Sequence, residues 1–220
     1  MTSRLADLFR DDKIVRKIQL NLPYLFQIAE LESSRAGKTG MEVGSVREKI
    51  LIALLIYYFG KENVETKLPI TEPEMDCKLF GVPVSIKTIT GLGGVKIIWT
   101  VDAQKAKEFR EAYTPKCDIL LALIRWEGRG GLYYIPLEVQ QQVFATMGRN
   151  HYIHLPKPGT NPRGVEFEKE ALLNLLRAKN TQTIEIEWRK RDIPFDPYKR
   201  WVDYWKEDQP KNQQTQLKSF

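Results

Sequence analysis

The chain has 220 residues, of which 42% are hydrophobic and 10% aromatic, and its formal net charge at pH 7 is +6. This composition excludes a disordered or fibrous chain, and a chain of this length can bury about 70% of its unfolded surface. Two cysteines make no disulfide framework, and no apolar leader or apolar run of the roughly 20 residues of a membrane span is present. We therefore expect a soluble intracellular protein.

The positive charge is unevenly distributed along the chain. Residues 51–76 contain two Lys or Arg against five Asp or Glu, whereas residues 77–117 contain seven against three. An acidic stretch beside a basic one suits a metal-dependent site on a phosphate polymer, because carboxylates hold a cation while basic groups bind the backbone. Chance clustering of charged residues produces the same pattern.

The N-terminal part of the chain is predicted to be helical and then irregular. Apolar residues recur at helical spacing over residues 4–32, and we expect Pro23 to divide this segment into two helices. Glycine and serine are frequent in residues 33–44, which predicts a loop.

Residues 45–59 are predicted to form a helix. Ser45 and Glu48 fit a capping box at its start, and Gly60 fits a C-terminal stop. The second half of the segment is apolar on every side, so we expect a buried, central helix.

Strands are predicted after this helix. Residues 76–90 indicate two strands separated by a turn or bulge at Gly81. Glycines then interrupt the chain, and residues 95–101 predict a third strand. Asp102 is the expected N-cap of a helix that runs to about Tyr113.

The C-terminal half continues the alternation of strands and helices. The apolar run of residues 117–126 is expected to lie in the centre of the sheet, because a strand covered on both faces is apolar throughout. The other expected elements are a strand at 132–135, a helix at 137–147, a loop at 148–164, a helix at 167–179, a strand at 183–188 and a helix at 198–207.

This order of elements predicts an α/β fold with a mixed β-sheet flanked by helices, rather than a doubly wound parallel sheet. We expect one domain over residues 1–208. It comprises N-terminal helices and a loop (1–44), a core (45–150) and a C-terminal helix–strand–helix segment (151–208). Residues 209–220 are expected to be a flexible polar tail.

Asp76 and Lys87 lie on either side of the expected turn. A strand, a turn at Gly81 and a returning strand place them side by side, and Ser85 shares a face with Lys87. Mg²⁺ prefers oxygen ligands, which Asp76 and the backbone carbonyl of Ile86 can supply. Lys87 can orient or deprotonate an attacking water and offset charge on a phosphate. The pair predicts metal-dependent hydrolysis of a phosphodiester.

This arrangement resembles the PD-(D/E)xK nuclease superfamily, whose core is a mixed sheet between helices. Asp76 matches the first Asp of the motif, and residues 85–87 match its tripeptide, with Ser85 where an acid is usual. In some members a Glu from the preceding helix supplies the missing carboxylate. The resemblance implies that Glu48 does so here, directly or through a water, whereas the capping box implies that Glu48 binds its own backbone.

The layout of Glu48, Asp76 and Lys87 is similar to that of the ThaI family of restriction endonucleases, over about residues 41–145. The resemblance implies a PD-(D/E)xK restriction-endonuclease-like core. It also implies a homodimer that acts in the cytoplasm of a prokaryotic cell. It further implies Mg²⁺-dependent cleavage of double-stranded DNA at CGCG to leave blunt ends, with a cognate DNA methyltransferase as a genetic rather than physical partner. A structure-selective repair nuclease, a junction resolvase or a non-catalytic DNA-binding protein are the alternatives.

Several residues are candidates for DNA contacts. Met41 can insert between base steps from the minor groove, where CG steps deform easily, or it can be an ordinary packed methionine. Guanine is usually bound by Arg or Lys, and Gln141 belongs to a run of three glutamines that can reach base edges or form a polar helix face. The candidates are Met41, Ser85, Lys96, Arg129, Gln141 and Arg149.

Other polar residues have alternative interpretations. Glu74 can share a face with Asp76 and serve as a backup ligand. His151 and His154 lack a third metal ligand. Basic and aromatic residues in 188–191 and 198–201 can bind a DNA backbone, or they can form a salt-bridged surface with interleaved acids.

Overall fold

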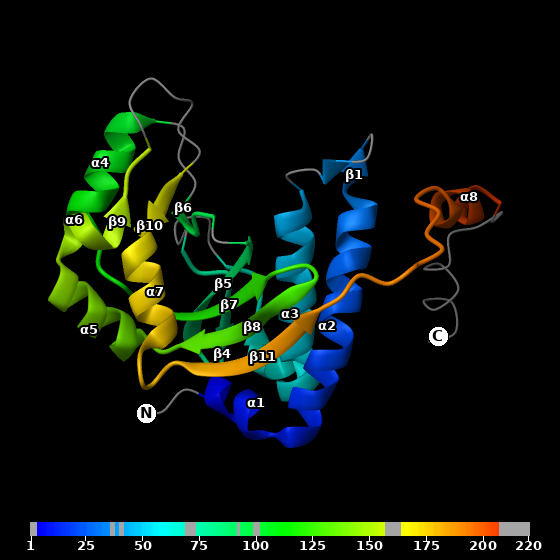
Figure 1. The fold of residues 1–220 in the computed structure, drawn as a ribbon, viewed down its shortest axis with the longest axis horizontal. Coiled ribbons are helices and arrows are strands. Elements are labelled where there is room, and N and C mark those ends of the chain that lie inside the picture. The colour runs from blue at the N-terminus through cyan, green and yellow to red at the C-terminus, as the bar shows by residue number, and fades with distance from the viewer. Residues whose placement is uncertain are drawn as a thin grey trace, which may run out of the picture.

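A mixed six-stranded β-sheet lies at the centre of the computed structural model (Figure 1). Two neighbouring strands in its middle are parallel, and the other neighbouring pairs are antiparallel, which confirms the expected α/β class. In spatial order the strands are β11 (Gln182–Trp188), β8 (Gly128–Ile135), β7 (Asp118–Ile124), β5 (Val82–Thr90), β4 (Cys77–Leu79) and β3 (Val64–Glu65). The structure describes residues 4–35, 38–39, 42–68, 74–91, 93–98, 102–156 and 164–206.

Helices cover both faces of this sheet, and each face has its own hydrophobic cluster (Figure 1). The first face is covered by η1 (Arg4–Ala6), α1 (Asp7–Arg10), α2 (Asp12–Glu32) and α3 (Val43–Phe59), with η2 (Lys61–Asn63) following α3. The second face is covered by α4 (Ala103–Ala112), α5 (Leu137–Met147), α6 (Arg149–Tyr152) and α7 (Lys169–Arg177).

Strand β7 is buried on both faces, as the apolar run in the sequence indicates. All of its residues are buried, and consecutive side chains belong alternately to the two clusters. For example, Leu120 packs among the N-terminal helices, whereas Leu121 packs against the later helices. Alternation of this kind follows from the two-residue repeat of a strand.

Helix α2 is continuous, so the expectation that Pro23 divides it is wrong. Proline inside a helix costs about 3 kcal/mol because it removes one backbone hydrogen bond and crowds the preceding turn. Pro23 is itself buried, and apolar residues on both sides of it, among them Ile18 and Phe26, pack against the sheet. Tertiary packing therefore keeps the helix intact through the proline.

The strand expected at residues 95–101 does not join the central sheet. The observed strand β6 (Lys96–Ile98) belongs to a separate antiparallel sheet, in the order β6, β10 (Val165–Phe167) and β9 (Ile153–His154). Val95 and Ile97 are buried in the second cluster, which favours this pairing. The expected loops also contain regular structure, namely α6 and β9 and the short pair β1 (Ser34–Arg35) and β2 (Lys38–Thr39).

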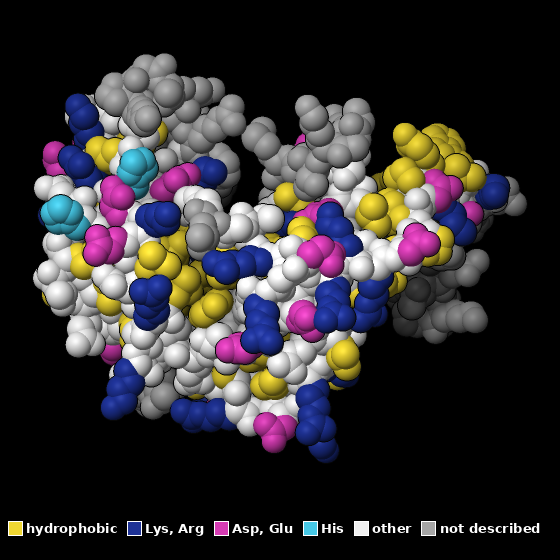
Figure 2. Space-filling model, in the orientation of Figure 1, with side chains coloured by type: hydrophobic (Ala, Val, Ile, Leu, Met, Phe, Trp, Pro, Cys, Tyr) yellow, Lys and Arg dark blue, Asp and Glu magenta, His cyan; other side chains and the backbone are white. Residues whose placement is uncertain are grey.

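The C-terminal helix α8 (Lys199–Trp205) stands apart from the sheet and its covering helices (Figure 1). Figure 2 shows apolar side chains gathered on the surface over α8. Trp201 and Trp205 are 55% and 89% exposed. Across the part of the chain that the structure describes, no helix combines the length and apolarity needed to cross a membrane.

Candidate active site

A tight hairpin between β4 and β5 brings the candidate residues together. Phe80 and Gly81 form its turn, both with positive φ, as the commonest two-residue hairpin turns require. The register pairs Cys77 with Val84, and the backbone N–H of Asp76 donates to the carbonyl of Val84 at 3.0 Å. Asp76 is therefore the first residue before β4, where its side chain reaches the middle of β5.

The carboxylate of Asp76 has three partners on β5. Its Oδ2 atom accepts from the backbone N–H of Ile86 at 2.6 Å and from Oγ of Ser85 at 3.3 Å. Nζ of Lys87 lies 3.6 Å from the same oxygen. The Asp76 and Lys87 side chains are 26% and 15% exposed, so both are accessible to a ligand although partly shielded from water.

The backbone carbonyl of Ile86 points to the same side of β5 as this carboxylate. The N–H and C=O groups of one strand residue point to the same neighbour, and the N–H of Ile86 is directed at Asp76. Strand β4 begins at Cys77, opposite Val84, so it does not pair with Ile86. This carbonyl oxygen and the Asp76 carboxylate therefore lie on the same side of β5, just beyond the point where β4 begins.

Glu48 lies close enough to this pair to interact with both charges. Burial and the negative charge of Asp76 raise the pKa of Glu48 to about 7, while Lys87 partly opposes the shift. The expected capping box is wrong, because α3 begins at Val43 and Glu48 is the sixth residue of the helix. A residue at that depth lies beyond the capping positions of the first turn. The Glu48 side chain is thus not used to cap the N-terminus of α3.

These groups suit a divalent cation such as Mg²⁺. Two carboxylates that repel each other and a nearby backbone carbonyl provide hard oxygen donors, and Mg²⁺ usually keeps several waters besides one or two carboxylates. Within the described ranges, no group of three or more His, Cys, Asp and Glu side chains could hold a metal ion. The donor set is therefore small and includes the backbone.

Glu74 lies beside a buried aromatic cluster. Its carboxylate interacts with the hydroxyl of Tyr113 and contributes to raising the pKa of that phenol, after burial itself. Burial, followed by the charge of Glu74, raises the pKa of Cys117 to about 12, and burial raises that of Cys77 to about 12. Both thiols are therefore protonated at neutral pH and are poor nucleophiles.

Among the described residues, the DNA-contact candidates do not lie in one cluster. Ser85 is 3% exposed and binds Asp76. Lys96 lies on β6 with Nζ 3.9 Å from Glu166, and Gln141 is exposed on α5. Arg149 on α6 donates to the carbonyl of Tyr113 at 3.3 Å. Met41 lies outside the described residues.

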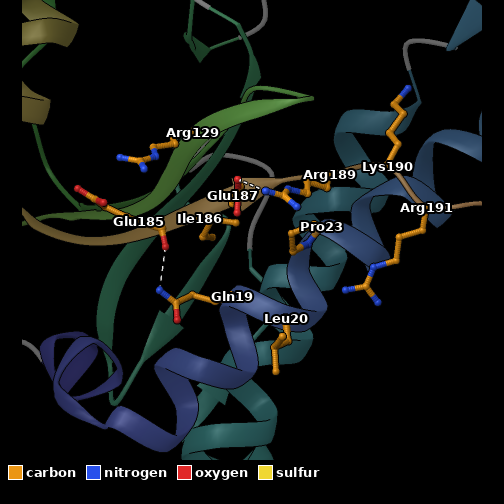
Figure 3. Close-up of a pocket in the computed structure, with 10 residues that line it drawn as sticks. All are labelled: Gln19, Leu20, Pro23, Arg129, Glu185, Ile186, Glu187, Arg189, Lys190 and Arg191. Carbon is orange, nitrogen blue, oxygen red and sulfur yellow. Dashed lines mark hydrogen bonds and ion pairs between the residues drawn. The ribbon is translucent and has the colours of Figure 1, made fainter.

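Arg129 lies in a separate cavity of about 660 Å³, shown in Figure 3. The cavity opens between α2, β8 and β11. Arg129 lies opposite Glu187 in the register of β8 and β11, and the Glu187 carboxylate forms an ion pair with Arg189 at 2.6 Å. The basic and acidic residues here are interleaved, as the sequence allowed. The same holds on α8, where Lys199 pairs with Asp203 at 2.5 Å.

A buried ion pair next to Glu48 is not among the features predicted from the sequence. Arg47 on α3 pairs with Glu30 on α2, and both residues are almost fully buried. A local signal existed, because Arg47 begins a short charged run in an otherwise apolar helix. Its partner is 17 residues away, however, and helical periodicity does not identify such a partner.

Comparison with known proteins gives a family and a solved structure that this chain resembles. A family model described as "Restriction endonuclease ThaI" matches residues 8–207. A solved structure described as "Restriction endonuclease in complex with substrate DNA" is 58% identical in sequence, with a TM-score of 0.87. That match covers 92% of this chain and 99% of the other chain. No curated protein sequence matches significantly.

Proposed function

This chain belongs to the restriction endonuclease ThaI family, and from that premise we propose that it is a Mg²⁺-dependent type II enzyme that cuts both strands of DNA at a short palindrome. The observation that carries the proposal is the convergence of Glu48, Asp76 and Lys87 at the β4–β5 hairpin. A relative with 58% identity was solved with its substrate DNA, which supports double-stranded DNA as the substrate here.

We assign separate roles to the residues of this site. Asp76, Glu48 and the carbonyl of Ile86 would hold the cation, which when bound supplies Lewis-acid stabilisation of the charge on the phosphate. Lys87 orients or deprotonates the attacking water and offsets negative charge on the scissile group. Ser85 is buried and donates to Asp76, so its role is to fix the orientation of that carboxylate.

The finer features of the proposal come from the family resemblance. We propose a CGCG site and blunt ends, with a homodimer whose two-fold axis matches that of the palindrome. The enzyme would act in the prokaryotic cytoplasm, where its DNA lies, and its methyltransferase would be a genetic partner. Of the DNA-contact candidates, Arg129 and Gln141 are exposed and available to DNA. Met41 is still proposed to insert between base steps from the minor groove.

We also propose that residues 1–208 form one domain. The two hydrophobic clusters lie on opposite faces of the same sheet and share strand β7, so neither can form without the other. The three segments expected within this domain all contribute to that sheet or its covering helices.

Digestion of a long DNA of known sequence, with mapping of the ends, tests this function. With Mg²⁺ we expect discrete fragments with blunt ends at CGCG, and with EDTA no cleavage. Discrete fragments at another site would overturn the CGCG assignment alone. Cleavage at branches or flaps regardless of sequence would favour a structure-selective nuclease. Binding without cleavage under any metal would favour a non-catalytic protein.

A further inference from the structure

The buried ion pair between Arg47 and Glu30 joins the helix that carries Glu48 to α2. Arg47 is 4% exposed and Glu30 is 8% exposed. Replacement of such pairs by apolar side chains is often neutral or stabilising, because both charges are removed from water. Stability alone therefore does not explain the pair, whereas its place next to Glu48 suggests a different role.

Glu30 is held by donors from three other parts of the fold. Besides Arg47, its Oε1 atom accepts from Nε1 of Trp126 at 2.6 Å, and Oε2 lies 3.4 Å from Nζ of Lys190. Trp126 lies in the turn between β7 and β8, and Lys190 follows β11. Hydrogen bonds to ionised groups are stronger than neutral ones, so the orientation of this carboxylate is well fixed. Arg47 thus has a rigid partner.

Arg47 also contacts the strand that carries Lys87. Its Nη1 atom donates to Oγ1 of Thr90 at 3.1 Å, and Thr90 is the last residue of β5. A guanidinium group is planar and presents its donors in fixed directions. Simultaneous bonds to Glu30 and Thr90 therefore restrict both the position of α3 and its rotation about its axis.

The rotation of α3 decides where Glu48 points. Neighbouring residues on a helix differ by about 100° in direction, so a helix fixed through Arg47 has Glu48 fixed as well. Thr90 is three residues beyond Lys87 on one strand, and the bond from Arg47 therefore ties α3 to the strand of the candidate site.

We propose that Arg47 is a positioning residue, and that its contacts with Glu30 and Thr90 hold Glu48 in place against Asp76 and Lys87. This inference rests on the proposed function, because it requires Glu48 to act at the metal site. Arg47 acts through the helix and touches no reacting atom. Loss of comparable support around a metal site typically lowers metal affinity or activity 10- to 100-fold.

Thr90→Val separates positioning from folding. The substitution removes one acceptor at an exposed strand end and leaves the buried ion pair intact. Because Nη1 of Arg47 then lacks this acceptor, we expect a small fall in melting temperature, well below that of Arg47→Met. We expect single-turnover cleavage and Ca²⁺ binding to the enzyme–DNA complex to weaken about 10-fold. DNA binding in EDTA should be unchanged. The matched control is Thr183→Val on β11, which is also exposed and should match the wild type in every measurement.

A double variant tests the ion pair itself. Arg47→Met alone leaves Glu30 buried without its main counter-charge, and it should lower the melting temperature. Glu30→Gln with Arg47→Met removes both charges, and Gln still offers an acceptor to Trp126, so the melting temperature should recover. Cleavage and Ca²⁺ binding should stay 10- to 100-fold below those of the wild type, because the bond to Thr90 is still missing. If the pair were purely structural, the double variant would recover cleavage and Ca²⁺ binding together with the melting temperature.

The same assays distinguish failure of this inference from failure of the proposed function. Absence of cleavage by the wild type, or full cleavage by Asp76→Asn, would overturn the proposed function. If the wild type cleaves and Asp76→Asn does not, the proposed function holds. The positioning role of Arg47 is then decided by Thr90→Val and by the double variant. Either Thr90→Val or the double variant matching the wild type in both cleavage and Ca²⁺ binding would overturn the role of Arg47 alone.

Discussion

Glu48 is the residue in which local environment and chemistry are most closely linked. Its pKa rises to about 7 because burial and the charge of Asp76 both disfavour the ionised form. Without metal, protons therefore bind Glu48 near neutral pH. A cation that requires the carboxylate must compete with them, so metal affinity should rise as the pH increases through 7.

The raised pKa also predicts how the metal-free protein responds to pH. A folded-state pKa of about 7, against an ordinary value of 4.5, means that Glu48 contributes stability below pH 4.5 that is lost as the pH rises through 7. Glu48→Gln removes this dependence. We therefore expect the melting temperature of the wild type, relative to that of Glu48→Gln in EDTA, to fall between pH 5 and pH 8.

The control for this prediction is Glu138→Gln, an exposed glutamate on α5. Its difference from the wild type should not vary over that range. A pH-independent difference between the wild type and Glu48→Gln would contradict the raised pKa.

Residue patterns predicted the hairpin of the candidate site well, because its information is local. The spacing of Asp76, Gly81 and Lys87 suffices to predict two paired strands and a turn. The Arg47–Glu30 pair could not be predicted in this way, since it depends on how α2 and α3 pack together. The contact between Trp126 and Glu30 joins residues that are 96 positions apart.

At the scale of elements, boundaries and partners were harder to predict than the elements themselves. The helix at 137–147 coincides with α5, and Asp102 caps α4 as expected. The start of α3 was misplaced because a capping motif also fits inside a helix. The strand at β6 was expected in the central sheet, but strand propensity does not identify the neighbour with which a strand pairs.

Helix caps give a prediction at this scale. Asp102 accepts from the backbone N–H groups of Gln104 and Lys105 at 2.8 and 3.4 Å, so Asp102→Ala should cost about 1 kcal/mol of unfolding free energy. Ser45 is the third residue of α3 and does not occupy the N-cap. Ser45→Ala should therefore change the free energy of unfolding by less than about 0.5 kcal/mol. Denaturant titration measures both, and equal losses would restore the capping box.

At the scale of the whole molecule, the central sheet links the two hydrophobic clusters. Strand β7 contributes side chains to each of them, and the candidate site lies on β5 beside it. This topology makes the fold of the candidate site depend on both layers of helices. It also explains why helices remote from the hairpin in sequence, such as α7, are needed to cover the sheet.

Two neighbouring leucines of β7 test this dependence. Leu120 and Leu121 are 0% and 1% exposed and face opposite clusters. Truncation of a buried leucine to alanine costs about 2–5 kcal/mol, so each variant should lower the free energy of unfolding by this amount. We expect calorimetry to show one transition, shifted in both variants. Two transitions, each shifted by only one variant, would contradict a single domain.

We propose that Glu48, Asp76 and Lys87 together form a metal-dependent nuclease site. Its most direct test is single-turnover cleavage of a CGCG duplex with Mg²⁺ by Lys87→Met, with DNA binding in EDTA measured alongside. The matched control is Lys78→Met, which removes a lysine paired with Glu65 at 3.5 Å on the neighbouring strand. We predict that Lys87→Met cleaves about 10²- to 10⁴-fold more slowly with unchanged binding, while Lys78→Met cleaves normally. Cleavage by Lys87→Met at the wild-type rate would contradict the proposed site.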